Sequence, residues 1–263
     1  MLDSTATSTS TSTTWPWLKD CDTGLTTTDP PIPPIDQYDD RPSVVSLLVE
    51  HQSYIDQVRD ELCLDPLYNC HKHDDLWILR FVLSHKKNVS SAVRAAKYTL
   101  AFRKEHQLDD HDVRYHNQLQ QPTPSANTNT NNTNDSESSL SSSVQRYMKY
   151  VRKDAIRFVI PDHQRSVILF IDISGVNQHE LVANVKESDW LPSYLYYNEM
   201  AYQWIDYITR RTGRLTKLVR IIDGQNIMPW KTINYECCRR DCVVMKMTED
   251  CLLSTIIRRD VYL

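Results

Sequence analysis

Two apolar segments on either side of a long helical pattern constrain the fold most strongly. Residues 166–173 read SVILFIDI, almost without a polar break, and residues 218–223 read LVRIID, where Arg220 and Asp223 interrupt an aliphatic run. Such runs are typical of strands that are buried on both faces of a parallel sheet. Apolar residues at helical spacing predict a helix over 188–211, and Gly213 follows where a left-handed cap suits the helix end. Strand, helix and strand in this order predict a parallel pair with a right-handed crossover.

Shorter elements extend this unit in both directions. Residues 158–160 predict a short strand before the first long one, and residues 178–185 predict a short helix after it. A further helix is expected over 230–253, followed by a strand over 260–263. The fold class predicted for this half is therefore α/β, with a mainly parallel sheet flanked by helices.

In the N-terminal half, the spacing of apolar residues predicts helices and no strands. Apolar residues follow one face over 43–64, and residues 74–105 read as two consecutive helices. Asp74 stands where its carboxylate can cap the first helix of that pair. A weaker helix is expected over 109–119, so this half forms a small helical lobe.

Two polar, low-complexity stretches divide the chain. Residues 1–42 are rich in Thr, Ser and Pro, and residues 120–143 are almost all Gln, Pro, Asn, Thr and Ser. Neither can bury enough apolar surface to offset the entropy of ordering. We therefore expect a disordered tail over 1–42, a helical lobe over 43–119, a linker over 120–143 and a second domain over 144–263.

Composition places few limits on partners but several on location. The 263 residues carry a net charge of −4, although residues 72–105 are locally basic. That bias is either a solvated helix face or an attraction to an anionic membrane surface, and no motif points to nucleic acid. No run approaches the ~18 apolar residues of a membrane helix, and the N-terminus lacks a secretory signal pattern. The expected location is the cytoplasm, with transient contact at membranes.

The seven cysteines do not form a disulfide pattern. Cys237, Cys238 and Cys242 fall close together on one predicted helix, where they suit small buried apolar side chains. The Cys70-His71-Lys72-His73 segment groups metal-ligand types, but no second ligand pair at zinc spacing accompanies it. Neither a metal nor another cofactor is expected.

The helix pair resembles the N-terminal lobe of the CRAL-TRIO family, which carries lipids and other hydrophobic molecules. That lobe commonly reads D-D-x-x-L-L-R-F-L-R-A-R-K-F-D-V. The positions that match here are Asp74, Asp75, Leu79, Arg80, Phe81, Lys86 and Val89. Leu83 and His85 replace two of the family's arginines.

The second half is similar to the family's lipid-binding domain in the order and spacing of its elements. Ile221-Ile222-Asp223 followed by Gly224 resembles a family strand that ends in D-x-x-G. In the family the domain continues past the point matched by Leu263, with more strands and a mobile gate helix. The resemblance thus implies a CRAL-TRIO-like sheet without its C-terminal part and gate helix.

The resemblance implies binding, and possible transfer between membranes, of a phospholipid such as a phosphoinositide or another hydrophobic molecule. The candidate ligand-binding residues are His85, Lys86, Lys87, Tyr194, Tyr197 and Arg220. Each has a plainer alternative. The basic residues 85–87 would instead form a solvated turn. Arg220 would form a salt bridge at the edge of the sheet, and the tyrosines would belong to the apolar core.

Enzymatic activity is not expected, because the chain has no G-x-S-x-G, P-loop or G-x-G-x-x-G motif. The second hypothesis for function is a protein-interaction or membrane-recruitment module that derives from a CRAL-TRIO domain and has lost its pocket. An exposed apolar sheet face and an unpaired edge would then need a covering partner.

Overall fold

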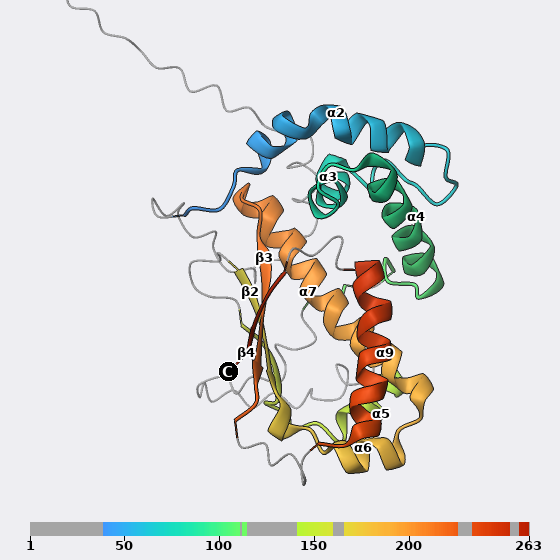
Figure 1. Ribbon diagram of the computed structural model, residues 1–263, viewed down its shortest axis with the longest axis vertical. Coiled ribbons are helices and arrows are strands. Elements are labelled where there is room, and N and C mark those ends of the chain that lie inside the picture. The colour runs from blue at the N-terminus through green and yellow to red at the C-terminus, as the bar shows by residue number, and fades with distance from the viewer. Residues whose placement is uncertain are drawn as a thin grey trace, which may run out of the picture.

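The computed structural model describes residues 39–110, 112–114, 141–159, 166–225, 233–252 and 258–262. The architecture is mixed α/β, with a sheet along one side of a set of helices (Figure 1). The sheet has 4 strands in the order β1-β2-β3-β4, in which β1 is antiparallel to β2 and the other neighbours are parallel. The strands are β1 Ile156–Val159, β2 Ser166–Asp172, β3 Lys217–Asp223 and β4 Arg258–Tyr262.

The predicted parallel pair with a connecting helix is confirmed. Strands β2 and β3 pair in parallel, and the long helix α7 (Trp190–Thr212) connects them. Gly213 ends α7 in the left-handed conformation with φ 63°, where a side chain would be strained. The register places Leu169 of β2 beside Arg220 of β3.

Helices cover one face of the sheet. Helices α7 and α9 (Tyr235–Leu252) lie along the same side of the strands (Figure 1). Every second strand residue turns to that side, and Val167, Leu169, Leu218 and Arg220 are buried there, whereas Ile171 and Ile222 are half-buried. The alternate residues of β2 and β3 are only half-buried. The sequence prediction of full burial on both faces was therefore too strong.

Three of the four helices predicted for the N-terminal lobe are present: α2 (Val44–Leu62), α3 (Asp75–Ser84) and α4 (Val89–Glu105). Each begins at a capping side chain, and the Asp74 carboxylate accepts a hydrogen bond from the Trp77 backbone N–H at 3.0 Å. The lobe has an apolar core of its own. Its fully buried side chains include Ile55, Leu62, Leu76, Ile78, Leu79 and Phe81.

Charged side chains join this lobe to α7. The Arg103 guanidinium of α4 donates to both carboxylate oxygens of Glu199 at 2.9 Å, and both side chains are buried. Arg80 of α3 donates to Asp206 at 3.0 Å, and Arg210 donates to the same carboxylate at 2.7 Å. These ion pairs fix the lobe against the second half of the chain.

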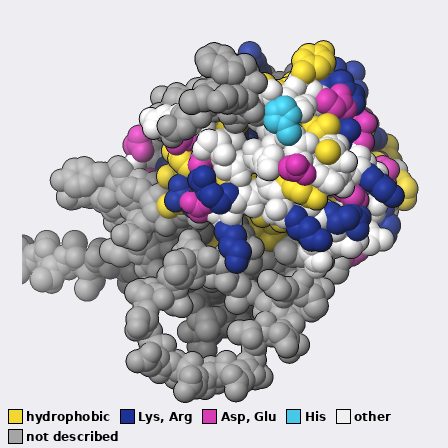
Figure 2. Space-filling view, turned by 90° about the horizontal axis from the view of Figure 1, so that it is seen from below, with side chains coloured by type: hydrophobic (Ala, Val, Ile, Leu, Met, Phe, Trp, Pro, Cys, Tyr) yellow, Lys and Arg dark blue, Asp and Glu magenta, His cyan; other side chains and the backbone are white. Residues whose placement is uncertain are grey.

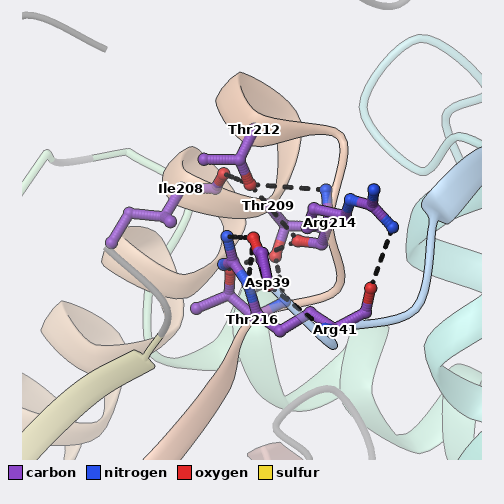
Figure 3. Close-up of polar contacts among 7 residues, drawn as sticks. All are labelled: Asp39, Arg41, Ile208, Thr209, Thr212, Arg214 and Thr216. Carbon is purple, nitrogen blue, oxygen red and sulfur yellow. Dashed lines mark hydrogen bonds and ion pairs between the residues drawn. The ribbon is translucent and has the colours of Figure 1, made fainter. Parts of the chain in front are cut away.

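The segment before α2 is also anchored. Arg41 donates to the Thr216 hydroxyl at 2.8 Å and to the Asp39 carboxylate, while Arg214 donates to the Arg41 carbonyl oxygen at 3.1 Å (Figure 3). The hydrogen bond from Arg41 lowers the pKa of Asp39 to about 2, although partial burial opposes the shift. The packed fold thus includes residues 39–42, which the sequence assigned to the tail; residues 1–38 lie outside the described residues.

Two predicted boundaries in the middle of the chain differ from the structure. Helix α5 (Ser142–Met148) begins inside the expected 120–143 linker, because the Ser141 hydroxyl caps it and Ser143 donates to Asp189 at 2.8 Å. The helix expected over 109–119 is absent from its described residues, which form turns and extended chain. There the Val113 N–H donates to the Gln203 side chain of α7, outside any helix.

The remaining elements follow the sequence closely. Helix α6 (Gln178–Asn184) lies between the 3-10 turns η4 (Ile173–Gly175) and η5 (Glu187–Asp189). Helix α9 begins later than predicted, because the Asn234 side chain accepts from the backbone N–H of Cys237 at 3.2 Å. Residues 226–232 lie outside the described residues.

Candidate ligand-binding cavity

A cavity of about 280 Å³ lies between the sheet and helices α7 and α9. Strands β1, β2 and β3 form one wall, and the two helices form the facing wall. Side chains from α5, η4 and α6 also line it. The hollow therefore sits within the α/β half of the molecule and away from the helical lobe.

The sheet wall is apolar except at one position. Leu169 and Ile171 of β2 are two residues apart, so they point to the same side of the sheet. Arg220 and Ile222 of β3 pair with them in register and line the same wall. The strand alternation thus places a single guanidinium among branched aliphatic side chains.

The helix wall carries more polar atoms. Its residues recur at helical spacing on the inner faces of α7 and α9. Those from α7 are Ser193, Tyr194, Tyr197 and Asn198, and those from α9 are Cys237, Cys238, Asp241, Met245 and Thr248. Several of the polar groups already serve the protein, since Asn198 donates to the Tyr194 carbonyl oxygen at 2.9 Å and Thr248 donates to the Val244 carbonyl oxygen at 3.1 Å.

Asp241 is the carboxyl group of this wall. Burial raises its pKa to about 6, although hydrogen bonds from the Tyr194 hydroxyl and the Cys237 thiol oppose the shift. A carboxyl group with this pKa is mostly ionised at pH 7 and takes up its proton as the pH falls through about 6. Asp241 therefore carries a negative charge in the cavity at neutral pH.

The other titratable groups beside Asp241 are neutral. Burial raises the pKa of Tyr147 and of Tyr194 well above the ordinary tyrosine value. Burial likewise raises the pKa of the Cys237 thiol, whereas a nucleophilic cysteine needs a lowered pKa. These groups can exchange hydrogen bonds with a ligand but carry no charge at neutral pH.

Arg220 supplies the permanent charge of the cavity. It lies on β3, between β2 and β4, and only 8% of the residue is exposed. The strand is not at the edge of the sheet, but Asp260 of β4 is the register neighbour of Arg220, so the alternative of a salt bridge stays open. Its fixed fork of N–H donors matches the two oxygens of a carboxylate.

The structure brings together three of the six candidate residues. Tyr194, Tyr197 and Arg220 all line the cavity. His85, Lys86 and Lys87 lie instead at the turn between α3 and α4, in the helical lobe. A phosphate contact at that turn would thus be separate from the cavity.

The basic turn has a local structural role. Lys86 and Lys87 have φ of 51° and 66°, and the Lys87 N–H donates to the Val82 carbonyl oxygen at 2.9 Å. This pattern closes a helix C-terminus in the Schellman manner. His85 is half-buried with its Nδ1 atom 3.1 Å from the Phe81 carbonyl oxygen, while both lysines are exposed.

Sequence reasoning missed several polar residues of the cavity, among them Asp241 and Tyr147. Asp241 follows Cys237 by four residues and precedes Val244 by three, so it stands in the buried stripe of α9. A carboxylate inside an apolar stripe is the signal that marks it. The predicted cysteine cluster is only partly buried, because Cys237 is buried, Cys238 is half-buried and Cys242 is exposed.

In the ranges that the structure describes, no three His, Cys, Asp or Glu side chains are grouped to hold a metal ion. Among those residues, no helix has both the length and the apolar character needed to cross a bilayer.

The surface near α5, α6 and the start of α9 carries both signs of charge. Viewed from below, basic and acidic side chains lie next to one another with apolar ones between them (Figure 2). Ion pairs between exposed side chains occur on these elements, such as Arg239 with Glu187 and Arg239 with Glu236. This face therefore presents no uniformly basic field to an anionic partner.

Comparison with known proteins identifies no relative of this chain. The chain matches no protein-family model, and no curated protein is significantly similar to it in sequence. The CRAL-TRIO resemblance thus stays a prediction from the sequence.

Proposed function

We propose that this protein binds one small hydrophobic molecule in the cavity between the sheet and helices α7 and α9, without altering it chemically. The observation that carries the proposal is the cavity itself, an apolar hollow of about 280 Å³ with a few polar groups on its walls. Ligand sites have this composition, in which apolar side chains supply burial and a few polar atoms supply orientation. The CRAL-TRIO resemblance implies a pocket beside the same strand and helix.

The volume favours a small ligand over a phosphoinositide. Binding sites for drug-sized molecules range over ~300–1,000 Å³, so a hollow of about 280 Å³ is at the lower end. A molecule with one aliphatic chain suits this space better than a lipid with two acyl chains. The separation of Lys86 and Lys87 from the cavity supports the same preference, since a phosphate there would lie apart from the buried tail.

The apolar hollow also favours a carrier over an interaction module that has lost its pocket. A module of that kind has no need for open space beside Arg220 and Asp241, and packing would fill it, because empty apolar space forfeits dispersion contacts. Transfer of the ligand between membranes is a further step, for which the mixed surface charge gives no added support.

A binding experiment with a cavity-filling variant tests the proposal. The probe is N-phenyl-1-naphthylamine, a neutral dye whose fluorescence rises in apolar surroundings. We expect saturable binding of one dye per full-length chain. In Ile222→Trp the new ring occupies the cavity, so dye affinity should fall at least tenfold.

The matched control is Ile221→Trp. Ile221 is the same residue type on the same strand, but its side chain points to the other side of the sheet. It should keep the affinity of the parent chain, and thermal unfolding of both variants would show that they fold. Absence of saturable binding by the parent chain, or equal affinity in the two folded variants, would overturn the proposal.

A further inference from the structure

We propose that the bound molecule is a hydrophobic amine whose ammonium group is held by Asp241 of α9. This inference rests on the proposed function, because it names the chemical class of the ligand in that cavity. The observation behind it is a carboxylate that pairs with no cation among the described residues. Asp241 lines the cavity, and its hydrogen-bond donors in that part of the chain are two neutral groups, the Tyr194 hydroxyl and the Cys237 thiol.

The cationic side chains closest in the sequence or across the cavity are engaged elsewhere. Arg240, the residue before Asp241, donates to the Glu236 carboxylate at 2.8 Å. Arg220 on the facing sheet wall has an interaction of its own within the protein, and Asp260 of β4 is its register neighbour. The negative charge of Asp241 is therefore left for a ligand to pair with.

The state of the carboxyl group favours a cation over a neutral head group. Burial raises the pKa of Asp241 to about 6, so it is mostly ionised at pH 7.5. A partly buried charge has lost hydration, and a cationic donor replaces that hydration best, because hydrogen bonds between ions are stronger than those to neutral groups. A carboxylate offers roughly four acceptor sites, so the two donors from the protein leave room for an ammonium N–H.

Tyrosine rings beside Asp241 favour the same head group. Tyr147 of α5 and Tyr194 and Tyr197 of α7 all line the cavity. The rings of Tyr147 and Tyr194 pack edge to face, with centroids 6.4 Å apart. An aromatic ring attracts a cation through the negative potential of its face. A carboxylate among such rings offers an ammonium group two kinds of attraction that an alcohol or a carboxylate does not receive.

The sheet wall accommodates the apolar part of the ligand. Leu169, Ile171 and Ile222 line the cavity across from the helix that carries Asp241. Transfer of each methylene of the tail from water to such surroundings is favourable. Tail burial thus supplies affinity for any molecule of this shape, and Asp241 selects the amine among molecules with the same tail.

Competition among three ligands with the same ten-carbon chain tests this inference. Decylamine, decanol and decanoate each compete with N-phenyl-1-naphthylamine for the full-length protein at pH 7.5. We expect decylamine to bind at least tenfold more tightly than either of the others. In Asp241→Asn its affinity should fall at least tenfold, to that of decanol, because the amide keeps the shape of the carboxylate without its charge. Thermal unfolding and saturable dye binding would show that this variant keeps its fold and its cavity.

The control is Glu236→Gln, which removes a carboxylate from the same helix. Glu236 pairs with Arg239 and Arg240 and does not line the cavity, so this variant should keep the preference for decylamine. Equal affinity for decylamine and decanol, tightest binding of decanoate, or an unchanged preference in Asp241→Asn would overturn the amine assignment and leave the proposed function standing. Failure of the dye and all three ligands to bind would instead overturn the proposed function.

Discussion

Helix α7 presents two opposite faces that are stabilised in different ways. Toward the sheet it buries apolar side chains, with Ala201, Ile205 and Ile208 packed near Val167 and Leu218. Toward the helical lobe it presents charged side chains, and Glu199 and Asp206 accept hydrogen bonds from arginines of α3 and α4. The residues of each set repeat at three or four positions or their multiples, so one helix separates the two kinds of contact.

The comparison shows what each kind of contact contributes. Apolar burial is non-directional and stabilises in proportion to the area removed from water. A buried ion pair contributes less net free energy, because desolvation of both charges offsets their attraction, but it requires a defined geometry. We infer that the sheet side of α7 supplies most of the stability and that the lobe side fixes how the lobe sits on it.

The same contrast appears in the pKa of two carboxyl groups. Burial alone would raise the pKa of Asp206, but Arg210 and Arg80 lower it below the ordinary value. Asp241, which faces the cavity, has hydrogen-bond donors from tyrosine and cysteine, and burial raises its pKa to about 6. Partner charge therefore decides which buried carboxyl group stays ionised.

The largest loss of stability is expected when an ion pair between α7 and the helical lobe is broken. Arg103→Met leaves the Glu199 carboxylate buried without its arginine, which should cost about 3–5 kcal/mol of unfolding free energy. The double variant Arg103→Met, Glu199→Met should recover most of that loss, because two apolar side chains replace the whole pair. Urea denaturation of the three proteins measures both values, and a double variant as unstable as the single one would contradict the comparison.

A substitution on the sheet side of α7 should lower the unfolding free energy in proportion to the side-chain volume that it removes. Ile205→Ala should cost about 2–5 kcal/mol and Ile205→Val about 0.5–1.5 kcal/mol, since Ile205 is 1% exposed in the sheet-side core. The same denaturation measurement applies. Equal losses for the two variants would show that something other than packing dominates at this face.

A third effect is expected at the cavity and depends on pH. The pKa of Asp241 is higher in the folded chain than its ordinary 3.8, so the folded state binds the proton more tightly and stability is lost as pH rises toward about 6. Asp241→Asn removes this penalty. The variant should match the parent at pH 4 and exceed it by on the order of 2–3 kcal/mol at pH 7.

Thermal and urea unfolding between pH 4 and pH 8 would measure this difference. The control is Asp206→Asn, because Arg210 and Arg80 keep that carboxylate charged in the fold. This control should lose stability at pH 7, opposite in sign to Asp241→Asn. A pH-independent difference between Asp241→Asn and the parent chain would rule out the proposed origin of the Asp241 penalty.

The sequence by itself determined the elements and their order. The strands at β2 and β3, the long helix between them and the helix pair of the lobe follow from side-chain periodicity. Asp74 and Gly213 mark helix ends because capping and backbone sterics act within a few residues. Boundaries near polar segments were less accurate, since the cap at Ser141 depends on α5 packing against the rest of the fold.

Only the tertiary structure decided which polar residues meet. Arg103 and Glu199 are 96 positions apart, and no local pattern identifies them as partners. Tyr194, Tyr197 and Arg220 come together with Asp241 around one cavity, whereas the basic turn at 85–87 lies in the other lobe. The physical reason is that burial and charge pairing depend on long-range packing, while periodicity and capping depend on neighbours along the chain.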